Sequence, residues 1–149
     1  MNQNSASQPG VNAIPTFAWV ILASLGAIDF VRGFLHTFMV EHSAQKIAGM
    51  NLEQAAGNQL MLLGAFGISN FLTGAIYLAV AFKARQLVPT VLAIIPLSYL
   101  LGFIGLRLNQ VHPEAAFPGR YFMLSYAIVC AATWALCLIW QRRRCTSEA

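Results

Sequence analysis

The sequence predicts an all-α integral membrane protein, built as an antiparallel four-helix bundle, and three observations lead to this prediction. Of its 149 residues, 58% are apolar and only 9% are charged, whereas about a quarter of the residues in a soluble domain are charged. Four apolar segments each supply the roughly 20 residues that a helix needs to cross a hydrocarbon core. The connections between them are too short for another domain. The predicted spans are residues 17–39, 60–82, 87–108 and 121–140.

Polar segments flank the predicted bundle, which covers residues 16–141. Residues 1–15 are uncharged and rich in Asn, Gln and Ser, a composition that predicts a disordered tail. Residues 142–149 begin with three arginines and form a predicted basic cytoplasmic tail. We expect the first span to stay in the mature protein, because no Lys or Arg precedes it and it is longer than the roughly 7 to 15 apolar residues of a signal peptide.

The basic residues are distributed unequally between the two ends of the predicted bundle. With four spans, both termini share one side with the connection between the second and third spans. The basic residues on that side are Lys83, Arg85, Arg142, Arg143 and Arg144. The other side carries Lys46 and Arg120, with Arg107 at its border. The positive-inside rule therefore predicts that both termini are cytoplasmic, in a cell inner membrane. The lack of a basic face argues against nucleic-acid binding.

The first span contains three polar side chains on one face. Asp29, Arg32 and His36 follow each other at spacings of three and four residues, which places them along one side of a helix. Each charge would cost roughly 2.5 to 3.5 kcal/mol at the centre of a lone membrane helix, so the other spans are expected to shelter them. Two interpretations remain open. Asp29 and Arg32 form a structural ion pair, or Asp29 binds a proton or a ligand and is tuned by its neighbours.

The second span carries a row of small residues. Gly57, Gly64, Gly67 and Gly74 keep one side of this helix free of bulk, a pattern typical of close helix packing in membranes. A wall of a ligand cavity is the alternative interpretation. Asn70 lies about half-way down the same span, where it could reach toward Asp29.

The remaining spans follow short connections. The connection at residues 83–86 is a tight turn, which makes the second and third spans antiparallel neighbours. Residues 107–120 are polar and lie on the side where His36 leaves the first span, so we expect an outward-opening polar cleft there. The candidate ligand or proton-binding residues are Asp29, Arg32, His36, Asn70, Arg107, His112 and Glu114.

No motif assigns a catalytic residue, and the sequence does not indicate an enzyme. The histidines and Glu114 lack the spacing of metal ligands on a helix, so neither a metal nor a cofactor is predicted. Cys130, Cys137 and Cys145 form no C-x-x-C pair and are interpreted as small side chains of a helix. No Ser or Cys lies in a recognisable nucleophile motif.

Several short stretches resemble a known group of proteins. They are Arg32-Gly-Phe-Leu-His36-Thr-Phe, residues 43–52, Gly64-Ala-Phe-Gly67-Ile and Leu87-Val-Pro89. Together they resemble small bacterial four-helix membrane proteins of the BphX-like and DoxX-like type, over the first two spans and the turn into the third. This resemblance implies the four-helix architecture. Some DoxX-type proteins act in quinol or thiosulfate oxidation, but none of their functional residues matches a position here, so no role is transferred.

Three functions are compatible with these observations. The first is an inner-membrane protein that uses the outward cleft to bind a small or lipidic ligand, or to act as an accessory subunit of a membrane-protein partner. The second is a redox-associated subunit working near quinone. The third is a small proton-coupled exporter with Asp29 as its carrier acid. The charge bias disfavours exporters that insert in both directions. In each case the lipid bilayer is the principal partner.

Overall fold

The computed structural model describes residues 14–53, 56–111 and 119–147, and four long helices account for most of this part of the chain. These helices are α1 (Thr16–Phe38), α3 (Ala56–Lys83), α4 (Val88–Leu108) and α5 (Gly119–Ser147). All four are long and apolar enough to cross a membrane. The predicted spans coincide with these helices to within a few residues, except that α5 continues to Ser147 and so includes most of the predicted basic tail.

Three short elements form the connections. After α1, the chain makes one turn of helix, α2 (Val40–His42), and a π-helical turn, η1 (Ser43–Ile47). Gly49 then has φ 65°, a left-handed conformation that glycine adopts without steric cost. The tight turn between α3 and α4 contains the 3-10 helix η2 (Arg85–Leu87), and Pro89 lies in the first turn of α4, where its missing N–H leaves no helical hydrogen bond unmade.

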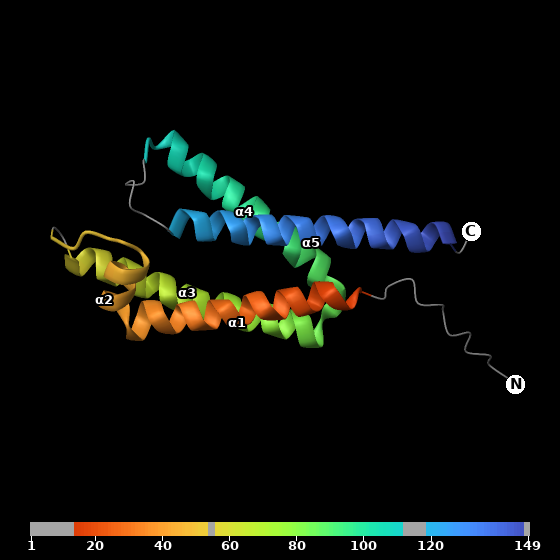
Figure 1. Ribbon diagram of the computed structural model, residues 1–149, viewed down its shortest axis with the longest axis horizontal. Coiled ribbons are helices and arrows are strands. Elements are labelled where there is room, and N and C mark those ends of the chain that lie inside the picture. Colours follow the sequence, from red (N-terminus) through yellow and green to blue (C-terminus); the bar gives the residue numbers. More distant parts are fainter. Residues whose placement is uncertain (1–13, 54–55, 112–118, 148–149) are drawn as a thin grey trace, which may run out of the picture.

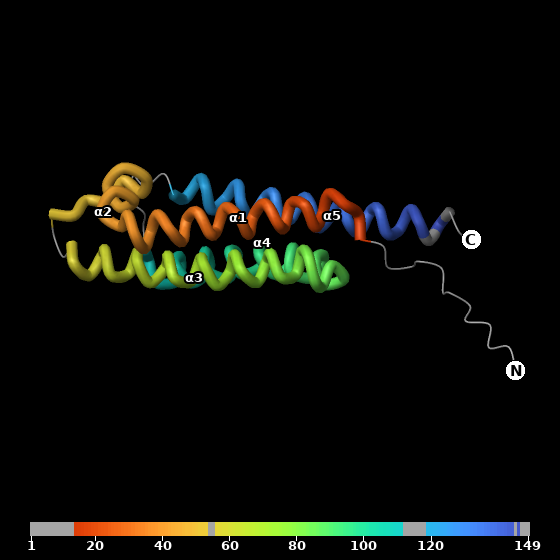
Figure 2. The backbone as a smooth tube through the Cα atoms, turned by 90° about the horizontal axis from the view of Figure 1, so that it is seen from below, coloured from red at the N-terminus to blue at the C-terminus, as the bar shows by residue number. Residues whose placement is uncertain are grey.

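The four long helices form two layers, α1 with α3 and α4 with α5 (Figures 1 and 2). Helices that follow each other in the sequence run in opposite directions, as predicted. The start of α1, the turn between α3 and α4 and the end of α5 lie at one end of the bundle. We call this the turn end, and the opposite end, where α2 and η1 lie, the loop end. That the turn end faces the cytoplasm stays a prediction.

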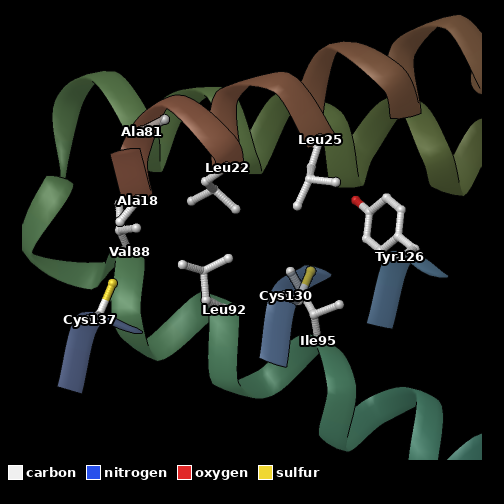
Figure 3. Close-up of a cluster of buried hydrophobic side chains, with 10 residues drawn as sticks. All are labelled: Ala18, Leu22, Leu25, Ala81, Val88, Leu92, Ile95, Tyr126, Cys130 and Cys137. Carbon is white, nitrogen blue, oxygen red and sulfur yellow. The ribbon is translucent and has the colours of Figure 1, made fainter. Parts of the chain in front are cut away.

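A cluster of buried apolar side chains joins all four helices in the half of the bundle next to the turn end (Figure 3). Its members are Ala18, Leu22 and Leu25 of α1, Ala81 of α3, Val88, Leu92 and Ile95 of α4, and Tyr126, Cys130 and Cys137 of α5. The two cysteines are free thiols and fully buried in helix α5, in agreement with their interpretation as small helix residues. Tyr126 lies at the edge of this cluster, where the polar groups begin.

Glycines bring α1 and α3 into close contact. A Cβ atom on Gly74 would lie 2.7 Å from the backbone oxygen of Gly26, and one on Gly26 would lie 3.0 Å from the backbone oxygen of Gly74. Gly67 packs in the same way against His36 and Thr37. The predicted small-residue face is therefore correct for Gly67 and Gly74. At Gly64 a Cβ would lie 3.9 Å from its nearest neighbour, an ordinary contact, and among the described residues nothing lies within 4 Å of a Cβ on Gly57.

The second layer packs less tightly. In α4 the buried residues are Val88, Leu92 and Ile95, all in its first half. The large apolar side chains from Leu97 onward are exposed, and this half of α4 diverges from α1 (Figure 1). In a membrane these side chains face lipid.

Candidate functional site

Asp29 is the centre of the candidate site. Its side chain is buried, with 3% of the residue exposed, and each carboxylate oxygen accepts one hydrogen bond. Arg32 donates from Nη1 to Oδ1 at 3.2 Å, and the hydroxyl of Tyr126 donates to Oδ2 at 2.9 Å. The first bond is one turn along α1, whereas the second links α1 to α5. A buried carboxylate with a cation and a donor is far less costly than an isolated one.

Three tyrosines surround this pair, one from each of the other long helices. Tyr77 of α3, Tyr99 of α4 and Tyr126 of α5 all interact electrostatically with Asp29, and the rings of Tyr99 and Tyr126 lie 6.1 Å apart. We call Asp29, Arg32 and these tyrosines the polar cluster. Sequence analysis missed the tyrosines. Their position well inside the spans was the available signal, because a buried tyrosine hydroxyl normally has a polar partner.

Arg32 lies between two aromatic rings. Its guanidinium carbon is 5.4 Å from the ring centre of Phe66 on α3 and 4.9 Å from that of Phe122 on α5. The side chain is 16% exposed. Cation-π contacts are strongest when water is excluded, so these rings and Asp29 together hold the charge inside the bundle. The prediction that the other spans shelter Asp29 and Arg32 is correct.

His36 is buried on the same face of α1, nearer the loop end. Its Nδ1 lies 2.5 Å from the hydroxyl of Ser43 in η1, and its ring centre lies 5.9 Å from that of Phe66. The histidine therefore fastens η1 to the end of α1.

Asn70 is a second buried polar residue, with 5% of its surface exposed. It follows Phe66 by one turn of α3, and Gly67 contacts His36, so Asn70 lies at the level of Arg32 along α1. Tyr77, two turns further along α3, shares its face of the helix. Among the described residues, the Nδ2 atom of Asn70 has no hydrogen-bond partner.

The other predicted site residues do not join the cluster. Arg107 is exposed near the end of α4, with its guanidinium 5.0 Å from the ring centre of Phe103. Arg107 lies apart from the polar cluster because the second half of α4 diverges from α1. His112 and Glu114 lie outside the described residues. Within the part of the chain that the structure describes, no three His, Cys, Asp or Glu residues are placed to hold a metal ion.

A groove of about 160 Å³ runs between α1 and α5, directly beside the cluster. The lining residues are Leu25, Ile28, Phe122, Ser125, Tyr126 and Val129. Ser125 directs its hydroxyl to backbone oxygens of its own helix, so the walls are apolar. The predicted polar cleft at the loop end stays a prediction, because residues 112–118 lie outside the described residues. The groove beside the polar cluster is a separate feature and has apolar walls.

Comparison with known proteins adds no assignment to this site. The resemblance to the BphX-like and DoxX-like proteins stays a prediction, because no family model, no curated protein and no solved structure matches the chain.

Proposed function

We propose that this protein is a multi-pass inner-membrane protein that binds an amphipathic, lipid-like molecule. The apolar part of the ligand lies in the groove between α1 and α5, and its head group lies next to the polar cluster. One observation carries this proposal. Tyr126 belongs to both parts, because its ring lines the groove while its hydroxyl bonds to Asp29.

The size and chemistry of the groove support a lipid-like ligand. Its volume of about 160 Å³ is well below the roughly 300 Å³ at which pockets for drug-sized ligands begin. It therefore suits a segment of hydrocarbon chain, with the rest of the ligand in the bilayer. Apolar walls beside a few polar groups are typical of small-molecule sites, where the polar groups fix orientation.

The energetics of the cluster support a functional use as well as a structural one. A hydrophobic bundle of this size could pack without ions, and replacing a buried ion pair by apolar residues is often neutral or stabilising. Ionisable residues inside a membrane are functional candidates for this reason. Here the ion pair lies beside the groove and not at the centre of the apolar cluster near the turn end.

Photolabelling tests the proposal. The full chain is reconstituted in phosphatidylcholine vesicles with a fatty acid that carries a diazirine on its chain, and labelled peptides are located by mass spectrometry. We expect labels on the α1 and α5 residues that line the groove. Ile28→Trp fills the groove and should lower this labelling roughly tenfold, which corresponds to about 1.4 kcal/mol.

Ile104→Trp is the matched control, because Ile104 on α4 is 45% exposed and Ile28 is 41% exposed, but Ile104 lies away from the groove. It should leave the labelling of α1 and α5 unchanged. Equal labelling of all lipid-facing helices, unaffected by Ile28→Trp, would refute the proposal. A crosslink from groove residues to another membrane protein, without lipid labelling, would instead assign the groove to an accessory-subunit contact.

A further inference from the structure

The hydrogen-bonding groups of the site indicate the chemistry of the ligand's head group. We propose that the head group carries an oxygen that accepts hydrogen bonds, either of a carboxylate or of an ester carbonyl, and that Asn70 and Arg32 donate to it. This inference rests on the proposed function. Lipid-like amines, which only donate hydrogen bonds, fit this arrangement less well.

The acceptors of Asp29 and His36 each have at least one partner. Both oxygens of Asp29 are used, one by Arg32 and the other by Tyr126. The Nδ1 atom of His36 is paired with Ser43. An ammonium head group would have to share the Asp29 carboxylate with Arg32 and Tyr126, and its charge would lie next to the guanidinium.

Donors, by contrast, are in excess. Asn70 is buried, with 5% of its surface exposed, and its Nδ2 atom has no hydrogen-bond partner among the described residues. A buried donor without a partner destabilises a fold, so such a group in the bundle interior points to a ligand. Arg32 has five N–H donors, of which Asp29 takes one, and Tyr99 also interacts with the guanidinium.

A chain of contacts connects Arg32 to the groove. Phe66, one turn before Asn70 on α3, packs over one side of the Arg32 guanidinium, and Phe122 packs over it from α5. Phe122 in turn lines the groove. A head group at the Phe122 end of the groove is therefore next to Arg32, and Asn70 lies at the same level of the bundle. Because Asp29 offsets the charge of Arg32, a neutral carbonyl and a carboxylate both fit.

Three probes of equal chain length test this inference: the diazirine fatty acid, its methyl ester and the corresponding alkyl amine. Each is added to the reconstituted full chain, and labelling of groove residues is compared. We expect the amine to label least. Labelling by both acid and ester identifies an accepting carbonyl oxygen, whereas labelling by the acid alone identifies an anionic head group.

Asn70→Leu removes the proposed donor while filling the space. It should lower labelling by the fatty acid and its methyl ester about fivefold, as expected for one hydrogen bond. Labelling by the amine should not change. Without ligand, the thermal stability of the variant should equal or exceed that of the unchanged protein. Asn58→Leu, at an exposed position of α3, is the matched control and should change none of these.

The possible outcomes separate this inference from the proposed function. If no probe labels the groove, the proposed function fails and this inference fails with it. If the acid, ester and amine label the groove equally, or if Asn70→Leu leaves acceptor labelling unchanged, the groove binds hydrocarbon without regard to head group. That result overturns the inference and leaves the proposed function standing.

Discussion

Asp29 and Arg32 show how a membrane protein accommodates ionic residues. Two unit charges at 4 Å attract each other by about 1 kcal/mol in water and by about 4 kcal/mol at an effective dielectric constant of 20. The attraction thus grows where water is scarce, but so does the cost of desolvating each group. The structure meets this cost locally, with a hydroxyl on Asp29 and two aromatic faces on Arg32.

Asp29→Asn should be the most damaging substitution in the cluster. It leaves Arg32 charged without a counterion, and breaking a buried pair in this way costs about 3 to 5 kcal/mol. Tyr126→Phe should cost less, because hydrogen bonds between membrane helices contribute about 0.6 kcal/mol on average and up to about 1.7 kcal/mol. Unfolding of the purified protein in detergent micelles measures both free-energy changes.

The double variant Asp29→Asn with Arg32→Gln separates charge from packing. If Asp29→Asn lowers the free energy of unfolding because the guanidinium of Arg32 loses its counterion, the double variant should be more stable than Asp29→Asn alone. Additive losses from the two substitutions would contradict this account of the pair, because they would show that each residue stabilises the bundle independently.

At the level of elements, the two layers pack by different means. Helices α1 and α3 approach closely through Gly26 and Gly74, because lipid offers no hydrophobic gain for burying larger side chains and close backbone contact supplies the attraction. Helices α4 and α5 are held by side chains in the half of the bundle next to the turn end, and α4 then diverges. The groove and the polar cluster lie between the layer of α1 and α3 and the layer of α4 and α5.

Gly74→Ala should separate α1 from α3. The added Cβ would lie 2.7 Å from a backbone oxygen of Gly26 and 2.8 Å from the ring of Phe30, and the backbone atom cannot rotate away. Overpacking of this kind costs about 1 to 3 kcal/mol. Thermal unfolding in detergent measures the loss.

Gly102→Ala is the corresponding control. Gly102 is also in a candidate membrane-spanning helix, but none of the described residues lies within 4 Å of its Cβ position. Alanine there should be neutral or stabilise α4 by up to about 1 kcal/mol through its higher helix propensity. If Gly102→Ala lowered stability as much as Gly74→Ala, the effect of both substitutions would come from the loss of glycine flexibility and not from close packing between helices.

At the level of the whole molecule, charge and aromatic residues define the two ends. At the turn end, Arg85 lies over the ring of Trp19 at 4.3 Å and Arg144 over that of Trp140 at 4.1 Å. At the loop end, Arg120 lies over Tyr121 at 4.6 Å. Aromatic and basic residues at both ends match the two interfaces of a bilayer, and the larger number of basic residues at the turn end favours the cytoplasm for that end.

Cysteine labelling tests this orientation. Gln45 in η1 and Gln86 in η2 are both exposed and uncharged, so Gln45→Cys and Gln86→Cys leave the charge bias intact. In a chain with Cys145→Ser, a membrane-impermeant maleimide should label Gln45→Cys in intact cells. It should label Gln86→Cys only after the cells are opened. The reverse pattern would place both termini outside the cytoplasm.

The sequence by itself determined the class of protein, the four spans, their alternating directions and the need to shelter Asp29 and Arg32. These follow from local quantities: apolar length, connection length and the cost of charge in lipid. Tertiary structure alone decided which side chains provide the shelter, because Tyr77, Tyr99 and Tyr126 come from three helices whose rotation about their own axes depends on packing. It also decided that α4 diverges, which separates Arg107 from the cluster. The apolar groove between α1 and α5 exists for the same reason, since no single helix contains both of its walls.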